Sequence, residues 1–191
     1  MYPTPRTLSK LKREIYLNAE RLFQDACHLF MQGSYPSACA LAVLAYEELG
    51  KLEMVDHICD DIILNPHVDR RDFLSHLFSR SMYFSHRTKQ EWASVFDGTP
   101  RRQTEVSQGR LEKLKQDALY VSYAKRRIVI PKRLTKNVAY RELRHAHAKF
   151  KRIGDLGFNG FYCDSTPHTK REAREHLKHL TTLIMLVRSR S

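Results

Sequence analysis

The sequence has 191 residues, 42% of them hydrophobic, and a formal net charge of +12. The length suits one domain with a real hydrophobic core. No window approaches eighteen uninterrupted apolar residues, and the first six residues lack the apolar core of a signal peptide. A membrane-spanning helix is therefore excluded, and we expect a cytoplasmic protein without a membrane partner.

Hydrophobic periodicity predicts mostly helical structure. The expected helices cover about 8–31, 36–63, 70–96, 109–120, 135–153 and 167 to the C-terminus. The helix at 36–63 is apolar all round near residues 38–45, which is typical of a helix surrounded by others. Polar residues 97–108 are expected to form a loop, 119–123 and 128–130 extended segments or a short hairpin, and 154–160 a Gly-rich loop.

These elements predict an all-α bundle with a short extended or hairpin insertion. We expect a single domain over residues 1–191, with a basic insertion at about 124–160. Cys27, Cys39, Cys59 and Cys163 are far apart and form no C-x-x-C pair, so we expect them to be reduced and structural.

The positive charge is concentrated in one segment. Residues 125–152 contain eleven Lys or Arg and one acid, Glu142, a net charge of +10. Such a segment favours contact with RNA, with Tyr123, Tyr140 and Phe150 available for base stacking. A solvated amphipathic helix, a membrane surface or an acidic protein partner are the alternatives. The expected RNA-binding residues are Lys125, Arg126, Arg127, Lys132, Arg133, Arg141 and Arg144.

Three segments resemble the AbiV family of the HEPN superfamily, over roughly residues 17–123. They are residues 40–51, which end in Glu-Glu-Leu-Gly-Lys; residues 86–89, which match the family's H-x-x-K; and residues 115–123, which match its K-x-x-x-L-Y-V-x-Y. The resemblance implies a HEPN-like helical bundle and a role in abortive infection. The wider superfamily implies metal-independent RNA cleavage and dimers that build a shared cleft.

Glu48 lies on an otherwise apolar stripe of the second helix, with Leu41, Ala45, Leu52 and Val55. A carboxylate in a packed face needs a partner, and a cation on the third helix is the best candidate. The alternative is a solvated pair with Lys51 at the helix surface. For Glu47, a pair with Lys51 four residues later is the expected arrangement.

His86 is the leading candidate for an acid/base residue. RNA cleavage needs a proton acceptor for the ribose 2′-hydroxyl and a donor for the leaving oxygen, and histidine titrates in the right range. Arg80 and Lys89 would hold the phosphate and Glu48 would orient these cations. Glu47, Lys51 and Arg87 would support this catalytic set. The alternative is a purely structural network of Glu48, His86 and Lys89.

The superfamily implies a nuclease signature of Arg, four to six residues, then His. Arg80 and His86 fit it, but the chain contains seven such pairs, and about three are expected by chance. Arg171 and His176, near the start of the last helix, form a rival site. A dimer could supply the arginine from the other subunit.

We expect no cofactor and no metal, since no acidic or cysteine cluster completes a site around His145 and His147 or His176 and His179. The expected partners are RNA and a second copy of the chain, with a phage-encoded activator or an antitoxin as further candidates. Two functions remain open: an endoribonuclease toxin of phage defence, or a non-catalytic factor that binds RNA or protein, and so blocks translation or senses a phage protein.

Overall fold

The computed structural model describes residues 5–64, 85–95, 99–120, 122–124, 127–129, 131, 134–155 and 167–190. The helices are α1 (Pro5–Met31), α2 (Tyr35–Leu64), α4 (His86–Val95), α5 (Pro100–Ser107), α6 (Arg110–Leu119), α7 (Lys136–Asp155) and α8 (Pro167–Ser189). Strands β1 (Ser122–Ala124) and β2 (Arg127–Val129) pair antiparallel, with Tyr123 opposite Ile128. The expected all-α fold is confirmed.

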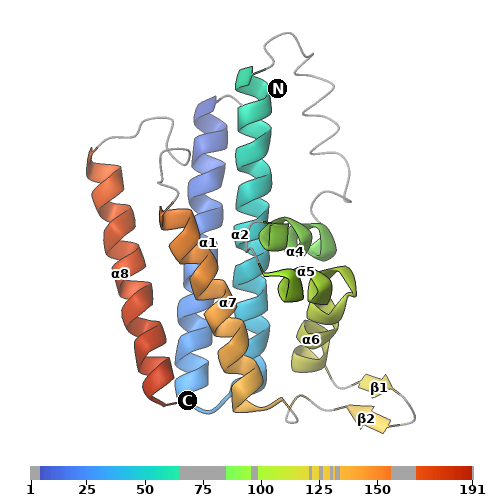
Figure 1. Ribbon diagram of the computed structural model, residues 1–191. Coiled ribbons are helices and arrows are strands. Elements are labelled where there is room, and N and C mark those ends of the chain that lie inside the picture. The colour runs from blue at the N-terminus through green and yellow to red at the C-terminus, as the bar shows by residue number, and fades with distance from the viewer. Residues whose placement is uncertain are drawn as a thin grey trace.

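The bundle is built around the long helices α1 and α2 (Figure 1). Gly33 lies between them with a φ of 82°, in the left-handed region that ends helices readily when the residue is glycine. Helix α8 lies beside α1, and the short helices α4, α5 and α6 lie beside α2 at the opposite edge of the bundle (Figure 1). Helix α7 crosses the pair and also contacts α4 and α5.

Helix α2 occupies the centre, as its apolar composition predicts. Ala38, Ala42 and Ala45 belong to the main hydrophobic core, which they share with α1, α7 and α8. Val43 and Tyr46 belong to a second cluster with residues of α4, α5 and α6. Because both sides of α2 are buried, this helix fixes the positions of all its neighbours.

Helix α7 is an amphipathic wall of the main core. Its predicted apolar stripe is buried throughout: Ala139, Leu143, Ala146, Phe150 and Ile153. Two charged residues of this basic segment are also fully buried. Lys149 donates to the carbonyl of Ala93 at 2.7 Å and pairs with Glu53 at 2.7 Å, and Glu142 pairs with Arg102 at 2.8 Å. Part of the positive charge of this segment therefore holds the bundle together.

The prediction that Phe150 is available for base stacking is wrong. Its ring is fully buried and contacts the rings of Tyr16 and Phe23, with centroids 5.6 and 5.5 Å away. Tyr140 is half-buried, with its ring 6.2 Å from Phe30. The side chain of Tyr123 lies outside the described residues.

The loop predicted for residues 97–108 is in fact helix α5. Thr99 and Pro100 begin it, with proline in the first turn, where its missing N–H is not needed. The segment is polar, but Arg102 and Val106 are buried. Arg101 pairs with Glu105, and Arg102 pairs with Glu105 and Glu142, contacts that the sequence pattern does not reveal.

Some predicted boundaries lie outside the described residues. Of the helix expected at 70–96, residues 85–95 are described, and helix α4 begins at His86, after a bend at Ser85. Helix α7 continues to Asp155, so Gly154 belongs to a helix and not to the predicted loop. Among the described helices, none combines the length and hydrophobicity that crossing a bilayer requires.

Cys27 and Cys39 are free thiols in the core. Burial raises the pKa of each thiol to about 12, so both stay protonated and unreactive near neutral pH. The side chain of Cys59 and the whole of Cys163 lie outside the described residues.

Candidate functional site

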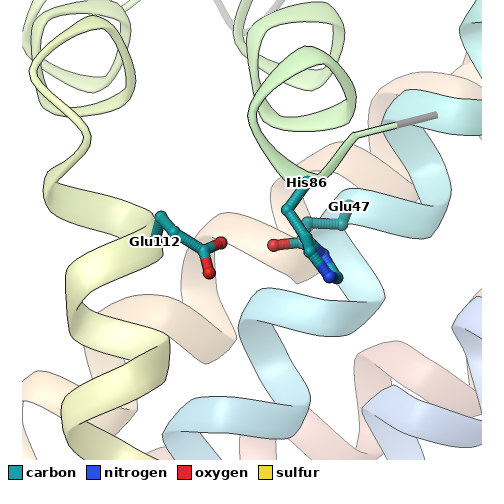
Figure 2. A group of neighbouring side chains, drawn as sticks. All are labelled: Glu47, His86 and Glu112. Carbon is teal, nitrogen blue, oxygen red and sulfur yellow. The ribbon is translucent and has the colours of Figure 1, made fainter. Parts of the chain in front are cut away.

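A buried carboxylate on α2 organises the candidate site (Figure 2). The side chain of Glu47 is 1% exposed. Its Oε2 lies 2.6 Å from Nδ1 of His86, and its Oε1 accepts hydrogen bonds from Nε2 of Gln90 at 2.6 Å and from Nζ of Lys115 at 2.9 Å. One carboxylate thus joins α2 to α4 and α6.

The contact with Glu47 determines the tautomer and the orientation of the His86 imidazole. An ionised carboxylate can only accept hydrogen bonds, so Nδ1 of a neutral ring must carry the proton. The other nitrogen, Nε2, is then unprotonated and can accept a proton from a ligand. The side chain of His86 is 53% exposed although its carboxylate partner is buried. The pair therefore has the oriented, accessible ring that general acid/base chemistry needs.

Lys115 balances the negative charge of the site. Its side chain is 3% exposed, and its Nζ lies 2.9 Å from Glu47 and 2.7 Å from Oε2 of Glu112. Burial raises the pKa of the Glu112 carboxyl, but hydrogen bonds from Lys115 and Gln116 and the nearby charges of Lys115 and His86 outweigh it. The pKa of Glu112 is consequently below its usual value, and the carboxylate stays ionised at neutral pH.

Glu48 faces a different set of partners. Its Oε2 accepts hydrogen bonds from Asn18 at 3.3 Å and from Lys51 at 3.5 Å, and its Oε1 lies 4.0 Å from Nζ of Lys89. The predicted pair of Glu47 with Lys51 is wrong, because Lys51 contacts Glu48. Adjacent helical residues point about 100° apart, so Glu47 faces α6 and the start of α4 while Glu48 faces α1 and Lys89.

Gly50 allows α2 and α4 to approach closely enough for these contacts. A Cβ added at Gly50 would lie 1.9 Å from the backbone oxygen of Lys89 and 2.9 Å from the Cβ and the backbone nitrogen of Ala93. No side chain fits in that space without moving α4. The glycine of the Glu-Glu-Leu-Gly-Lys segment thus brings α4, which begins at His86, close to α2.

Glu47, His86 and Glu112 could also hold a metal ion, since each offers one ligand atom and these atoms lie within 4.8 Å of one another (Figure 2). No sequence motif indicated this set. The ammonium of Lys115 already contacts both carboxylates, so a divalent cation would have to displace it or remove its proton. The residues as arranged therefore fit a metal poorly.

His147 and His176, two of the histidines considered as metal ligands from the sequence, each contact other residues. His147 stacks on Phe23 and lies 3.2 Å from the hydroxyl of Thr181. Burial and the charge of Lys151 lower the pKa of His147, so its ring is neutral at pH 7. His176, on α8, contacts Glu20 of α1 instead of His179.

The rival site also contains a carboxylate–imidazole contact. Nδ1 of His176 lies 2.7 Å from each carboxylate oxygen of Glu20, and the histidine side chain is 31% exposed. It is less accessible than His86. The side chain of Arg171, its proposed partner, lies outside the described residues.

The remaining candidates divide between described and undescribed parts of the chain. Arg87 is exposed. Its guanidinium pairs with Glu91 at 2.9 Å and not with Glu47 or Glu48. Arg80 lies outside the described residues. So do Lys125, Arg126, Lys132, Arg133 and the side chain of Arg127. On α7, Arg141 is partly exposed and paired with Glu142 and Glu105, and Arg144 is exposed.

Sequence reasoning missed Lys115, Gln90 and Glu112 as site residues. Lys115 carried a signal, because it is the first residue of the third segment used for the family resemblance. In the structure, one residue from each of the three segments meets the others: Glu47, His86 and Lys115. Nothing in the sequence motifs marks Gln90 or Glu112 as a site residue. Gln90 lies one helical turn after His86, and Glu112 lies one turn before Lys115.

Comparison with known proteins gave one family match. The family model HEPN_AbiV, described as AbiV, matches residues 7–151. The match includes most of α7, which lies beyond the segment 17–123 that the sequence motifs had suggested. No curated protein and no solved structure matches the chain.

The close approach at Gly50 predicts that Gly50→Ala destabilises the protein. Alanine would gain about 1 kcal/mol of helix propensity. The clash with the backbone of α4 should cost more, since overpacking of this kind costs about 1–3 kcal/mol. Urea unfolding should show a net loss of free energy of unfolding, while Ser37→Ala on the same helix should change it little. A Gly50→Ala protein as stable as the wild type would contradict the packing described here.

The charge balance at Glu47 predicts that Lys115→Met is strongly destabilising. Removing one partner of a buried ion pair costs about 3–5 kcal/mol, because the other charge stays buried. The double variant Glu47→Gln/Lys115→Met removes both charges and should recover most of that loss. The free energies of unfolding of all four proteins form a double-mutant cycle. Additive effects of the two substitutions would refute a direct coupling.

Proposed function

The chain belongs to the AbiV family of the HEPN superfamily, a family of abortive-infection proteins of phage defence, and on that premise we propose that it is a metal-independent endoribonuclease toxin. His86 is the acid/base residue. Glu47 is its positioning residue, because the carboxylate acts through the imidazole.

One observation carries this proposal: the 2.6 Å contact between buried Glu47 and the half-exposed ring of His86. A surface histidine without such a contact would be free to rotate and would populate both tautomers. The buried carboxylate supports one ring orientation and one tautomer, and it stabilises the imidazolium that forms when Nε2 takes up a proton. A histidine that only packed against neighbours would not need an accessible Nε2.

The proposed reaction needs only the RNA itself and the imidazole. Nε2 of His86 takes the proton of a ribose 2′-hydroxyl, and the 2′-oxygen attacks the adjacent phosphorus. The bond from phosphorus to the 5′-oxygen breaks, and the leaving oxygen receives the proton from the imidazolium. The products are a 2′,3′-cyclic phosphate and a 5′-hydroxyl, and no water is consumed.

The phosphorane that forms in this reaction gathers negative charge, and nearby cations would stabilise it. Lys89 is the described candidate, since it lies one helical turn after His86 and its ammonium is 4.0 Å from Glu48. Glu48, which also pairs with Lys51 at 3.5 Å, orients that ammonium. Arg80 would be a second phosphate contact, and Arg87 a peripheral one. The strand would be held by two arginines of α7, partly exposed Arg141 and exposed Arg144.

A non-catalytic role is the second candidate, and one observation favours it. Glu47 already accepts hydrogen bonds from Gln90 and Lys115, so its contact with His86 completes a saturated network that would stabilise the bundle without any reaction. In that case the protein would bind RNA or a protein and so block translation or sense a phage component.

A cleavage assay separates the two functions. Purified protein is incubated with labelled RNA in EDTA, and we expect products ending in a cyclic phosphate. His86→Ala should reduce the rate at least ~10²-fold, the usual contribution of a general acid/base. Glu47→Gln should lower kcat and leave KM nearly unchanged, because it disturbs the orientation of the ring and removes no contact with the strand.

Three outcomes would redirect the proposal. No cleavage by the wild type, with or without a phage-encoded activator, would leave the non-catalytic function. Loss of cleavage in His176→Ala alone would move the site to α8 and Glu20. Activity that appears only when Mn²⁺ or Zn²⁺ replaces EDTA would identify Glu47, His86 and Glu112 as metal ligands.

We also expect a homodimer, because the wider superfamily builds its cleft between two chains and an arginine from the second subunit could complete the site. Light scattering at micromolar concentration should give twice the chain mass of 22.5 kDa. A mass of one chain would refute a shared cleft. An antitoxin that restrains the protein would be detected as a separate, larger complex.

A further inference from the structure

A groove of about 580 Å³ lies between α5 and α7. Four arginines, two from each helix, line it: Arg101, Arg102, Arg141 and Arg144. None of its lining residues belongs to the contacts of Glu47 in the candidate site. The chain therefore has a second concave surface, in which arginine is the commonest residue.

The arginines of the groove are only partly neutralised by two carboxylates. Glu105 lies 3.4–4.0 Å from three of them. Glu142 contacts Arg102 at 2.8 Å and Arg141 at 2.9 Å. Arg144 is exposed and pairs with none of the described acids. Four guanidinium groups and two carboxylates leave the groove with an excess of two positive charges.

Arg102 provides the second, independent sign of a ligand. Its side chain is 1% exposed, and its Nη1 contacts Glu105 and Glu142. Its Nε and Nη2 are buried and have no hydrogen-bond partner among the described residues. Leaving a buried donor unsatisfied costs about 1–3 kcal/mol, and more for a charged group. These two N–H groups form a fork that matches the two oxygens of a carboxylate.

The depth of Arg102 selects among the possible anions. An internal phosphodiester lies between two nucleosides, so it can approach exposed Arg144 but not a guanidinium that is 1% exposed. A phosphomonoester ends a chain but carries nearly two charges, and the cost of removing an ion from water rises with the square of its charge. Glu142, 2.8 Å from Arg102, would repel the second charge. A side-chain carboxylate has one charge, two oxygens and a flexible stem, which suits this position.

We propose that this groove is a docking site for an acidic segment of a protein partner. One aspartate or glutamate of the segment reaches Arg102, and a second one pairs with Arg144, which together match the excess of two positive charges. Arg144 is also one of the two arginines that would hold an RNA strand. A docked segment therefore displaces the strand and inhibits the protein. This inhibition, unlike the docking, rests on the proposed function.

Docking is tested with a defined peptide and needs no cleavage. A capped heptapeptide of glycine and serine, with two glutamates at alternate positions, is titrated into the full isotope-labelled chain at physiological salt, and amide shifts are followed by NMR. Alternate residues of an extended chain face the same side, so both carboxylates can enter the groove. We expect saturable shifts in α5 and α7, and at least tenfold weaker binding when glutamines replace the glutamates. Equal binding of the two peptides, or shifts confined to other helices, would overturn the docking site.

Matched variants test which arginines bind the peptide. Arg144→Gln removes an exposed arginine of the groove, and Arg110→Gln removes an exposed arginine of α6 outside it. Arg102→Lys keeps the buried positive charge but loses the fork of Nε and Nη2. We expect Arg144→Gln and Arg102→Lys each to weaken peptide binding about threefold or more, and Arg110→Gln to leave it unchanged.

Equal effects of Arg144→Gln and Arg110→Gln would show attraction to net charge alone and would refute the proposal. Circular dichroism checks that each variant is folded. If Arg102→Lys unfolds the chain, the comparison of the other two variants still decides between docking in the groove and attraction to net charge.

Inhibition is tested by competition with an RNA that cannot be cleaved. A 2′-O-methyl oligouridylate is titrated with and without saturating peptide, and we expect the peptide to weaken RNA binding about fivefold or more. RNA binding that the peptide leaves unchanged would refute the inhibition. An RNA that does not bind at all would instead count against the strand-holding role of Arg144, and the docking would stand. If Arg102→Lys weakens RNA binding as much as peptide binding, nucleic acid is the ligand of the groove and the proposal is wrong.

Discussion

The arrangement of the short helices depends on the burial of one negative charge. A carboxylate removed from water is tolerated only when charged or hydrogen-bonding groups replace the lost hydration. Glu47 obtains these groups from two separate helices, His86 and Gln90 from α4 and Lys115 from α6. Because the three contacts converge on two oxygen atoms, neither helix can shift along α2 without removing at least one partner of the buried charge. The same requirement that stabilises the bundle therefore positions the imidazole.

The motif on α2 combines three physical tasks within one and a half helical turns. Glu47 supplies the buried charge, Glu48 holds the lysines at the edge of the site, and Gly50 leaves space for the backbone of α4. Only glycine can do the last of these, because even a methyl group would meet the carbonyl oxygen of Lys89. The motif thus specifies a distance between two helices as well as a set of functional groups.

Sequence patterns predicted the helices better than the site. The apolar stripes of α1 and α7 follow the helical period, and α2 is apolar all round near residues 38–45, so the boundaries and buried faces of these helices could be predicted closely. Helix α5 was missed because its buried residues include Arg102, which periodicity counts as polar. Glu47 and Glu48 were assigned each other's environments, because a stripe of apolar neighbours indicated burial of Glu48 while the contacts with α4 and α6 made Glu47 the more buried residue. Lys115 is 68 residues from Glu47, and no local pattern reports a contact over that distance.

The burial of basic side chains changes how the protein acts on a distant polyanion. Lys12, Arg102, Lys115 and Lys149 are all buried, and each is held against a carboxylate. To a distant charge, such an ion pair acts as a dipole. The potential of a dipole falls with the square of distance, and salt reduces it further. The formal charge of α7 consequently overstates its attraction for a distant polyanion. Buried Lys149 stabilises the helix packing and adds almost nothing to the external potential. Any long-range attraction of a polyanion would come from the cations that remain at the surface, and their placement matters more than their total.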